Sequence, residues 1–126
     1  MNKNKNCLSI IIPAHNESHC IYSTVNQLHT TLKLAKIDHE ILVINDHSTD
    51  HTLFILRQLK LDLPDVFSFF ENQSPPGFGF AIRTGLENFK GDVVATVMAD
   101  GSDLPDDVVR FFQKIDEGYE CVFGSR

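Results

Sequence analysis

The sequence contains only three cysteines, at positions 7, 20 and 121 of its 126 residues. Their odd number and scattered spacing do not form a disulfide framework or a zinc-binding pattern. We therefore expect free, buried thiols in a reducing compartment, which indicates a cytoplasmic protein. Association of the full-length protein with the cytoplasmic face of a membrane stays open at this point.

Long apolar stretches are also missing from the sequence. No run of residues is long enough to cross a bilayer. The first apolar run, residues 8–12, is too short for the core of a signal peptide and meets Pro13. The sequence therefore predicts neither a membrane-spanning helix nor a secretion signal.

Basic runs are absent as well, and the formal net charge is -6. An acidic chain of this kind is a poor non-specific partner for nucleic acid or for an anionic membrane surface. A bound anion such as a nucleotide must then be held locally, by a metal ion, by helix N-termini or by a few arginines.

The sequence does contain a regular alternation of strand-like and helix-like segments. Short apolar and β-branched runs predict strands over residues 8–12, 40–44, 66–70, 92–98 and 119–123. Apolar residues at three- and four-residue spacing predict helices over residues 17–35, about 53–60, 80–89 and 105–115. Asn16 and Asp50 are the expected caps of the first two helices. The continuous apolar run at 92–98 predicts a strand buried on both faces.

This alternation predicts an α/β fold, in which a mostly parallel sheet is covered by helices on both faces. We expect residues 1–126 to form a single domain. Ligands bind such sheets at the carboxyl ends of the strands. The segments that follow the expected strands are therefore the candidate site, and they cover residues 13–17, 45–50, 72–83, 99–103 and 124–126.

Asp100 and Asp103 follow the most apolar of these strands. Two carboxylates three residues apart in one loop can converge on a hard cation, and Mg²⁺ and Mn²⁺ require oxygen ligands. Such an ion would stabilise a diphosphate leaving group. The alternative is that Asp103 only caps the helix that begins near Pro105, with Asp106 and Asp107 as acids of its first turn.

Two further strand-end segments carry polar candidates. Asp46 can accept a hydrogen bond from a nucleobase or can cap a helix, and the residues alone leave both interpretations open. Gly77 and Gly79 precede Arg83 at a helix start, where backbone amides can approach a phosphate. A lone Gly-x-Gly is weak evidence for a phosphate site, and Ile82 stands where a dinucleotide-binding fingerprint needs Gly or Ala. The main alternative is that this segment is a simple loop-to-helix turn.

His15, Glu17 and His19 superficially look like a zinc-binding helix. The glutamate is misplaced for a His-Glu-x-x-His motif, and His15 is expected to precede the helix. The histidines are more simply interpreted as surface or pocket-rim residues, so zinc is disfavoured.

Five segments, taken together and in this order, resemble the family 2 glycosyltransferases of the GT-A fold, especially the dolichyl-phosphate mannose synthase-like and bacterial polyprenyl-phosphate enzymes. The segments are 8–17 (LSIIIPAHNE), 43–50 (VINDHSTD), 77–86 (GFGFAIRTGL), 91–100 (GDVVATVMAD) and 122–126 (VFGSR). The resemblance implies a Rossmann-like GT-A fold that binds a nucleotide-sugar. It also implies inverting, metal-assisted transfer of the sugar from a UDP- or GDP-sugar to a polyprenyl (dolichyl-type) phosphate or a glycan acceptor.

The resemblance implies roles for individual residues on the donor side. The nucleoside pocket would be lined by four residues that follow the first strand, namely Pro13, Ala14, His15 and Glu17. Asp46 would contact the base, while Gly79 and Arg83 would lie near the donor.

The remaining implied roles concern the diphosphate. Asp100 would hold Mg²⁺ or Mn²⁺ there, and Arg126 would approach the phosphates or the acceptor. The family's Asp-x-Asp motif appears here with Met98 in place of its first Asp. Either Asp103 compensates for this change or metal binding is weaker.

Two other departures affect what is expected. His15 stands where the family commonly has an aromatic residue, often Tyr, which leaves the packing of the base open. Family members continue beyond the point where this chain ends, with an acceptor-binding half and often membrane anchors. We therefore expect a domain that is truncated at its C-terminus, with an open sheet edge that permits self-association.

Two rival interpretations belong to other classes. In the first, the chain is a binding module that holds a nucleotide-sugar without catalysing its transfer. In the second, it is an unrelated α/β nucleotide or phosphate binder. The lack of a glycine-rich loop after the first strand and of a Gly-Lys-Ser/Thr phosphate loop argues against the second.

Overall fold

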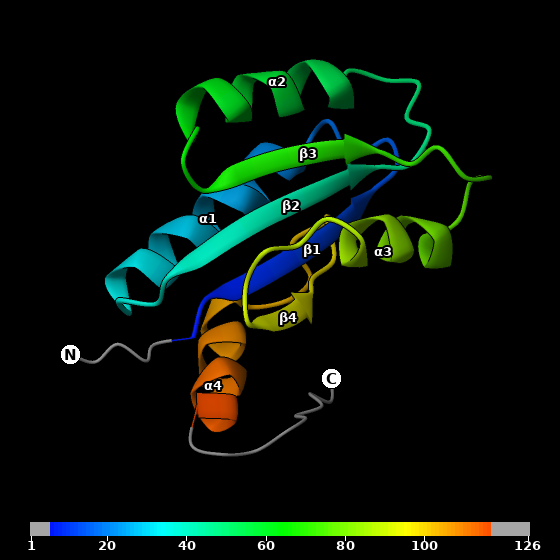
Figure 1. Ribbon diagram of the computed structural model, residues 1–126. Coiled ribbons are helices and arrows are strands. Elements are labelled where there is room, and N and C mark those ends of the chain that lie inside the picture. Colours follow the sequence, from blue (N-terminus) through cyan, green and yellow to red (C-terminus); the bar gives the residue numbers. More distant parts are fainter. Residues whose placement is uncertain (1–5, 117–126) are drawn as a thin grey trace.

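The computed structural model describes residues 6–116, which contain a four-stranded sheet (Figure 1). Its strands lie in the order β3-β2-β1-β4, and all three pairs of neighbours are parallel. The strands are β1 (Leu8–Ala14), β2 (His39–Asn45), β3 (Phe67–Glu71) and β4 (Val93–Thr96). The parallel sheet expected from the sequence is therefore confirmed. The expected strand at 119–123 lies outside the described residues.

Four helices connect and follow these strands: α1 (Ile21–Leu34), α2 (Thr52–Asp62), α3 (Phe78–Leu86) and α4 (Pro105–Asp116). Helices α1, α2 and α4 contribute to one hydrophobic cluster and α3 to another. Figure 1 shows α3 on the opposite side of the sheet from α1. The expectation of helices on both faces is confirmed. Within residues 6–116, no helix has the length and apolar character needed to cross a membrane.

The central strand β1 is buried on both sides because its side chains alternate between the two clusters. Ile10 and Ile12 belong to the larger cluster, with α1, α2 and α4. Ile11 belongs to the smaller one, where it packs with Ile44 and Ala81. The continuous apolar run of β1 therefore lies in the core on both faces of the sheet, directly before the loop that starts at residue 15.

The sequence predicted that the first strand ends before Pro13, but the structure includes Pro13 in β1. The strand continues to Ala14, and Pro13 pairs with Ile44 of β2. The last residue of β1 that pairs with β4 is Ile11. Since Pro13 lies beyond that point, its missing N–H interrupts no ladder with β4, which makes a proline tolerable inside this strand.

The first helix begins later than expected, at Ile21 rather than at residue 17. Asn16 is not its cap, because Asn16 has a left-handed backbone with φ of 53°. Cys20 occupies the cap position and makes no side-chain capping bond. Residues 18–20 form a turn instead, in which the carbonyl of Glu17 accepts hydrogen bonds from the amides of Cys20 and Ile21.

Two other boundaries differ from the predictions. Strand β4 is shorter than 92–98, and its residues are half-buried or exposed rather than buried on both faces. It lies at the edge of the described sheet, where β1 is its single neighbouring strand. Helix α3 starts at Phe78, directly after Gly77 with φ of 150°, and ends at Leu86 rather than at residue 89.

Candidate functional site

The loops after β1 and β2 are tied together at the carboxyl end of the sheet. The amide of Asn16 donates to Ser48 Oγ at 2.9 Å, and the amide of Glu17 donates to Thr52 Oγ1 at 3.0 Å. In the other direction, Asn16 Oδ1 accepts the amide of Thr49 at 2.7 Å. These bonds make residues 15–20 and 46–52 one assembly, at the edge where parallel α/β sheets bind ligands.

Asp50 anchors this assembly to the start of α2. Its Oδ1 accepts hydrogen bonds from the amide of Thr52 at 2.9 Å and from Thr52 Oγ1 at 2.5 Å, and its Oδ2 accepts the amide of Ser18 at 3.2 Å. Burial alone would raise the pKa of Asp50, but the hydrogen bonds from Thr52 and Ser18 outweigh it and hold the pKa well below its usual range. The cap position of α2 is occupied by His51 and not by Asp50, which the sequence had predicted as the cap. Asp50 nevertheless accepts the amide of Thr52, the first residue of α2.

Asp46 connects the end of β2 to the loop after β3. It is 7% exposed. Its Oδ1 accepts Asn72 Nδ2 at 2.9 Å, and its Oδ2 accepts the amide of Gly77 at 3.1 Å. These bonds do not reach α2, and one of them comes from the amide of Gly77, which occupies the cap position of α3. The base contact remains a prediction.

His15 lies at the exposed rim of the same assembly. Its Nδ1 lies 2.7 Å from the carbonyl oxygen of Asp46, and its Nε2 lies 3.4 Å from Asn16 Nδ2. Because a carbonyl can only accept, Nδ1 carries the proton and Nε2 accepts. The two residues before His15 are less exposed, since Pro13 is half-buried and Ala14 is buried. Of the four residues predicted to face a nucleoside, Ala14 and His15 are in hydrogen-bond contact with Asp46, and Glu17 is bonded to Thr52 instead.

The loop after β4 presents Asp100 at this edge. Asp100 is exposed, and its Oδ1 accepts the amide of Ser102 at 2.9 Å, across Gly101 with φ of 78°. Asp103 Oδ2 accepts the amide of Met98 at 2.8 Å and closes the loop. The carbonyl of Ala99 accepts Thr24 Oγ1 at 2.9 Å, which fixes the loop to α1.

These contacts allow a test of whether Mg²⁺ or Mn²⁺ suits the loop. Asp100 and Asp103 come from one tight loop, and both offer the carboxylate oxygens that these ions prefer. Asp100 also lies close enough to Cys20 for its charge to contribute to the raised pKa of that thiol. A divalent cation fits the chemistry of this loop, with Asp100 as the exposed carboxylate and Asp103 held to the amide of Met98, two residues beyond β4.

The remaining predicted residues lie outside this hydrogen-bonded assembly. Gly79 and Arg83 are on the exposed surface of α3. A Cβ placed on Gly79 would meet no atom within 4 Å, so the space above its backbone is open to a ligand. Arg126 lies outside the described residues.

Two functional positions were not singled out from the sequence. Asn72 is buried and is the partner of Asp46. Its place directly after the third strand was a usable signal. Cys20 was expected to be a buried thiol, but it is only half-buried, and its Sγ donates to Glu17 Oε1 at 3.3 Å. Its spacing of three residues from Glu17, across a turn, was the signal in that case.

Comparison with known proteins identifies the family. The model of glycosyl transferase family 2 matches residues 9–126. The uncharacterized glycosyltransferase YkcC of Bacillus subtilis (strain 168) is 32% identical over 120 residues, which are 94% of this chain and 36% of that protein. The undecaprenyl-phosphate 4-deoxy-4-formamido-L-arabinose transferase of Pseudomonas fluorescens (strain Pf0-1) is 28% identical over 116 residues, 92% of this chain and 34% of that protein.

Solved structures agree with this fold. The mannosyltransferase PcManGT from Pyrobaculum calidifontis, solved with GDP-Man and Mn²⁺, has a TM-score of 0.68 and 24% identity over 76% of this chain and 28% of its own. TarS 1–349 of S. aureus, solved with UDP-GlcNAc, has a TM-score of 0.63 and 23% identity over 85% of this chain and 31% of its own. The Rossmann-like GT-A fold expected from the resemblance is confirmed.

The chain spans about a third of the length of the curated relatives that it matches, since it covers 36% and 34% of the two named above. The family match extends over nearly the whole chain, from residue 9 to residue 126. The strand-end loops described here lie inside that match. The chain therefore belongs to glycosyl transferase family 2.

Proposed function

We propose that this chain forms the nucleotide-sugar-binding part of a glycosyltransferase that uses a UDP- or GDP-sugar as donor. One observation carries the proposal. The loops after β1 and β2 are joined by the Asn16–Ser48 bond, those after β2 and β3 are joined by the bonds of Asp46 to Asn72 and Gly77, and the exposed Asp100 stands at the same edge of the sheet. Solved relatives with the same fold hold GDP-Man with Mn²⁺ or UDP-GlcNAc.

In this proposal, different residues contact different parts of the donor. Pro13, Ala14, His15 and Glu17 line the nucleoside pocket, and the acceptor-only carboxylate of Asp46 contacts N–H groups of the base. Gly79 and Arg83 approach the donor from α3, and Arg126 approaches the phosphates or the acceptor. The family resemblance supports all of these roles, and the position of the first five residues at the end of β1 and in the loops after β1 and β2 supports theirs as well.

Asp100 and Asp103 hold Mg²⁺ or Mn²⁺ in the same proposal. When bound, such an ion supplies Lewis-acid stabilisation of the negative charge that develops on the diphosphate. Asp100 binds from its exposed position, and Asp103 orients the loop through the amide of Met98. The transfer inverts the configuration of the sugar.

The acceptor is a polyprenyl phosphate or a glycan. A phosphate oxygen is already ionised at neutral pH, so a lipid phosphate needs no general base, whereas a glycan hydroxyl usually does. The relative from Pseudomonas fluorescens, by its name, uses undecaprenyl phosphate, which favours the lipid. We also propose that the protein acts in the cytoplasm at the inner face of the membrane, where a lipid phosphate acceptor would lie.

Calorimetric titration with UDP and with GDP, each with and without Mn²⁺, tests the donor site. We expect metal-dependent binding of one nucleotide. Asp100→Ala should abolish the metal dependence, while Asp106→Ala, which removes an exposed acid on α4, should leave it unchanged. Equal binding by the folded Asp100→Ala variant, with the same response to Mn²⁺, would count against the metal role.

A second candidate function is a binding module that holds the donor without transferring its sugar. The match covers 36% and 34% of the two named relatives, so donor binding and sugar transfer need to be tested separately for these residues. Incubation of the chain with UDP- and GDP-sugars separates the two candidates. Release of free sugar or transfer to a lipid phosphate would exclude the module, and donor binding with neither reaction would support it.

A further inference from the structure

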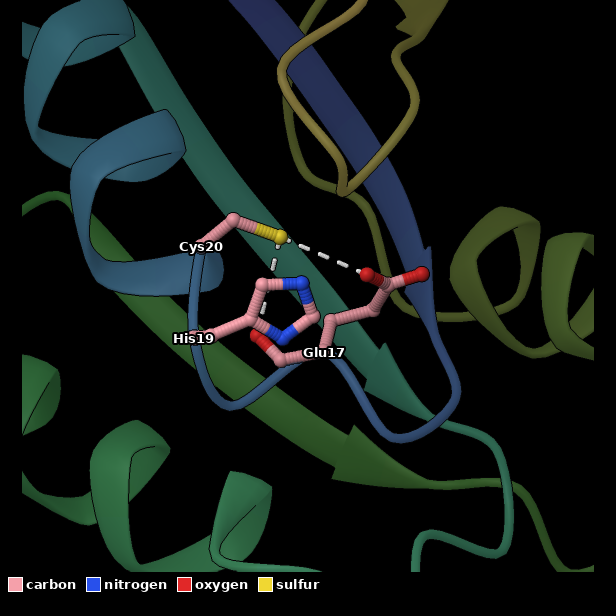
Figure 2. A group of neighbouring side chains, drawn as sticks. All are labelled: Glu17, His19 and Cys20. Atoms are coloured by element: carbon pink, nitrogen blue, oxygen red, sulfur yellow. Dashed lines mark hydrogen bonds between the residues drawn. The ribbon is translucent and has the colours of Figure 1, made fainter.

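The turn between β1 and α1 brings three metal-ligating side chains together. The ligand atoms of Glu17, His19 and Cys20 all lie within 4.8 Å of one another. Figure 2 shows the thiol of Cys20 and the carboxylate of Glu17 pointing toward each other, with the His19 ring beside them. The zinc pattern disfavoured from the sequence was His15, Glu17 and His19, whereas the structure groups Glu17 and His19 with Cys20 in place of His15.

The separations within this group suit a small tetrahedral ion. Zn–S bonds of about 2.3 Å and Zn–N or Zn–O bonds of about 2.0 Å place neighbouring ligand atoms roughly 3.3–3.6 Å apart. Cys20 Sγ and Glu17 Oε1 already lie 3.3 Å apart. His19 is exposed. Rotation of its side chain can therefore bring the ring nitrogen about 1 Å closer to the other two ligand atoms without disturbing the core.

The backbone holds two of the three residues in place. The amide of Glu17 donates to Thr52 Oγ1 at 3.0 Å. Its carbonyl accepts the amide of Cys20 at 3.1 Å and that of Ile21 at 2.9 Å. Glu17 and Cys20 are therefore fixed relative to each other and to the start of α1, which lowers the ordering cost of binding an ion.

The charge of the ligand set also favours a cation. Cys20 Sγ donates to Glu17 Oε1 at 3.3 Å, so a carboxylate lies directly beside the thiol. A thiolate and a carboxylate together supply the negative charge that a divalent ion needs, and the imidazole of His19 adds a neutral ligand.

We propose that Glu17, His19 and Cys20 bind one Zn²⁺ ion, with water in the fourth position. On binding, the Cys20 thiol releases its proton to solvent as the S–Zn bond forms. A thiolate and an imidazole are softer ligands than the oxygens preferred by Mg²⁺ and Mn²⁺, so the set selects Zn²⁺ over these ions. The site goes beyond the proposed transfer reaction and does not depend on it, although it shares Glu17 with the predicted nucleoside pocket.

Cobalt is the first probe, because a Co²⁺–thiolate bond absorbs in the near ultraviolet. The untagged chain would carry Cys7→Ser and Cys121→Ser, so that Cys20 is the only thiol. We expect the band to appear on titration with Co²⁺ and to vanish when Zn²⁺ is added. Absence of the band overturns the proposal, and so does a band that persists after Cys20→Ser.

The other two ligands are tested by the affinity for Zn²⁺, measured by competition with a colorimetric chelator. We expect His19→Ala and Glu17→Gln each to weaken binding by more than about tenfold. His51→Ala is the matched control, because His51 is an exposed histidine at the start of the next helix, and it should bind like the parent. Equal loss in the control, or displacement of Zn²⁺ by excess Mg²⁺, contradicts the assignment.

Folding of every variant is checked by far-ultraviolet circular dichroism and by its unfolding midpoint. If Cys20→Ser fails to fold, Cys20→Ala provides the same test without a hydroxyl. Because nucleotide is absent from these titrations, their outcome is separate from that of the donor-binding experiment. Zinc binding without nucleotide binding supports the zinc site and contradicts only the donor proposal. Nucleotide binding without zinc binding supports the donor proposal and contradicts only the zinc site.

Discussion

Asn72 donates a hydrogen bond from its side-chain amide to the carboxylate of Asp46 at 2.9 Å, and both residues are buried. The two lie 26 positions apart in the sequence and meet only because β2 and β3 are neighbours in the sheet. Asn72 Oδ1 also accepts the amide of Ser74 at 3.0 Å. The pair therefore determines the path of the loop that leads from β3 to α3.

Asn72→Ala should lower the free energy of unfolding by about 1–3 kcal/mol, because it leaves a buried carboxylate with one donor fewer. Urea denaturation measures the change. Gln73→Ala is the control, since Gln73 is the exposed neighbour and should shift stability by no more than about 0.5 kcal/mol. Indistinguishable midpoints for the two variants would show that the Asp46–Asn72 bond contributes nothing.

Two glycines of α3 should respond to alanine in opposite directions. A Cβ on Gly85 would lie 2.5 Å from Cγ2 of Ile11, a fully buried side chain that has no room to move. Overpacking of this kind costs about 1–3 kcal/mol. Gly79→Ala meets no atom within 4 Å and should stabilise the helix by up to about 1 kcal/mol. Thermal melts of both variants test the contrast, and a stabilising Gly85→Ala would be inconsistent with the packing of α3 on β1.

Acid should weaken the fold through His29. Its Nδ1 lies 2.9 Å from Nε2 of His39, whose own Nδ1 donates to the carbonyl of Ile37. Burial, followed by the charges of His39 and Lys33, lowers the pKa of His29. A lowered folded pKa gives stability that is complete above the unfolded value of about 6.5 and is lost as the pH falls below it.

The melting temperature should therefore fall between pH 7 and pH 5, and it should fall less in His29→Gln. His51→Gln, at an exposed position, should keep the slope of the parent. The same slope in all three proteins would mean that other groups produce the acid sensitivity.

Asp50→Asn should destabilise the protein at neutral pH, because it removes the charge that accepts bonds from Thr52 and Ser18. The depressed pKa of Asp50 gives stability that is present above the unfolded value of about 3.9 and is lost as the pH falls through the folded value. The difference in melting temperature between parent and variant should thus shrink below about pH 4. Asp106→Asn should show no such convergence, since Asp106 is an exposed acid on α4.

The local patterns of the sequence were sufficient to predict the elements of the fold. The apolar run of β1 and the spacing of Ile21, Val25, Leu28 and Leu32 predicted a strand and a helix where the structure has them. Asn16 shows where such reasoning failed. Asparagine is a common cap, but here its left-handed backbone and its bonds to Thr49 and Asp50 depend on a loop more than 30 residues away.

The candidate site was predictable as a set of segments rather than as a set of contacts. The rule that ligands bind at strand ends selected the segments of Asp46, Asn72 and Asp100, and the structure joins the first two of these segments. The pairing of Asp46 with Asn72 could not be predicted, because it requires the order of the strands in the sheet. The Glu17–Cys20 contact was missed for another reason, namely that residues 18–20 were assigned to a helix whereas they form a turn.

The hydrogen bonds that join the loops after β1 and β2 have a thermodynamic consequence. Hydrogen bonds within the chain hold these loops in one arrangement, through Asn16, Glu17, Ser48 and Thr52. A molecule that settles between them does not have to order the backbone, so little conformational entropy is lost on that side of the pocket. The heat capacity change of binding should then reflect the surface that the ligand itself buries, with no added contribution from folding of the loops.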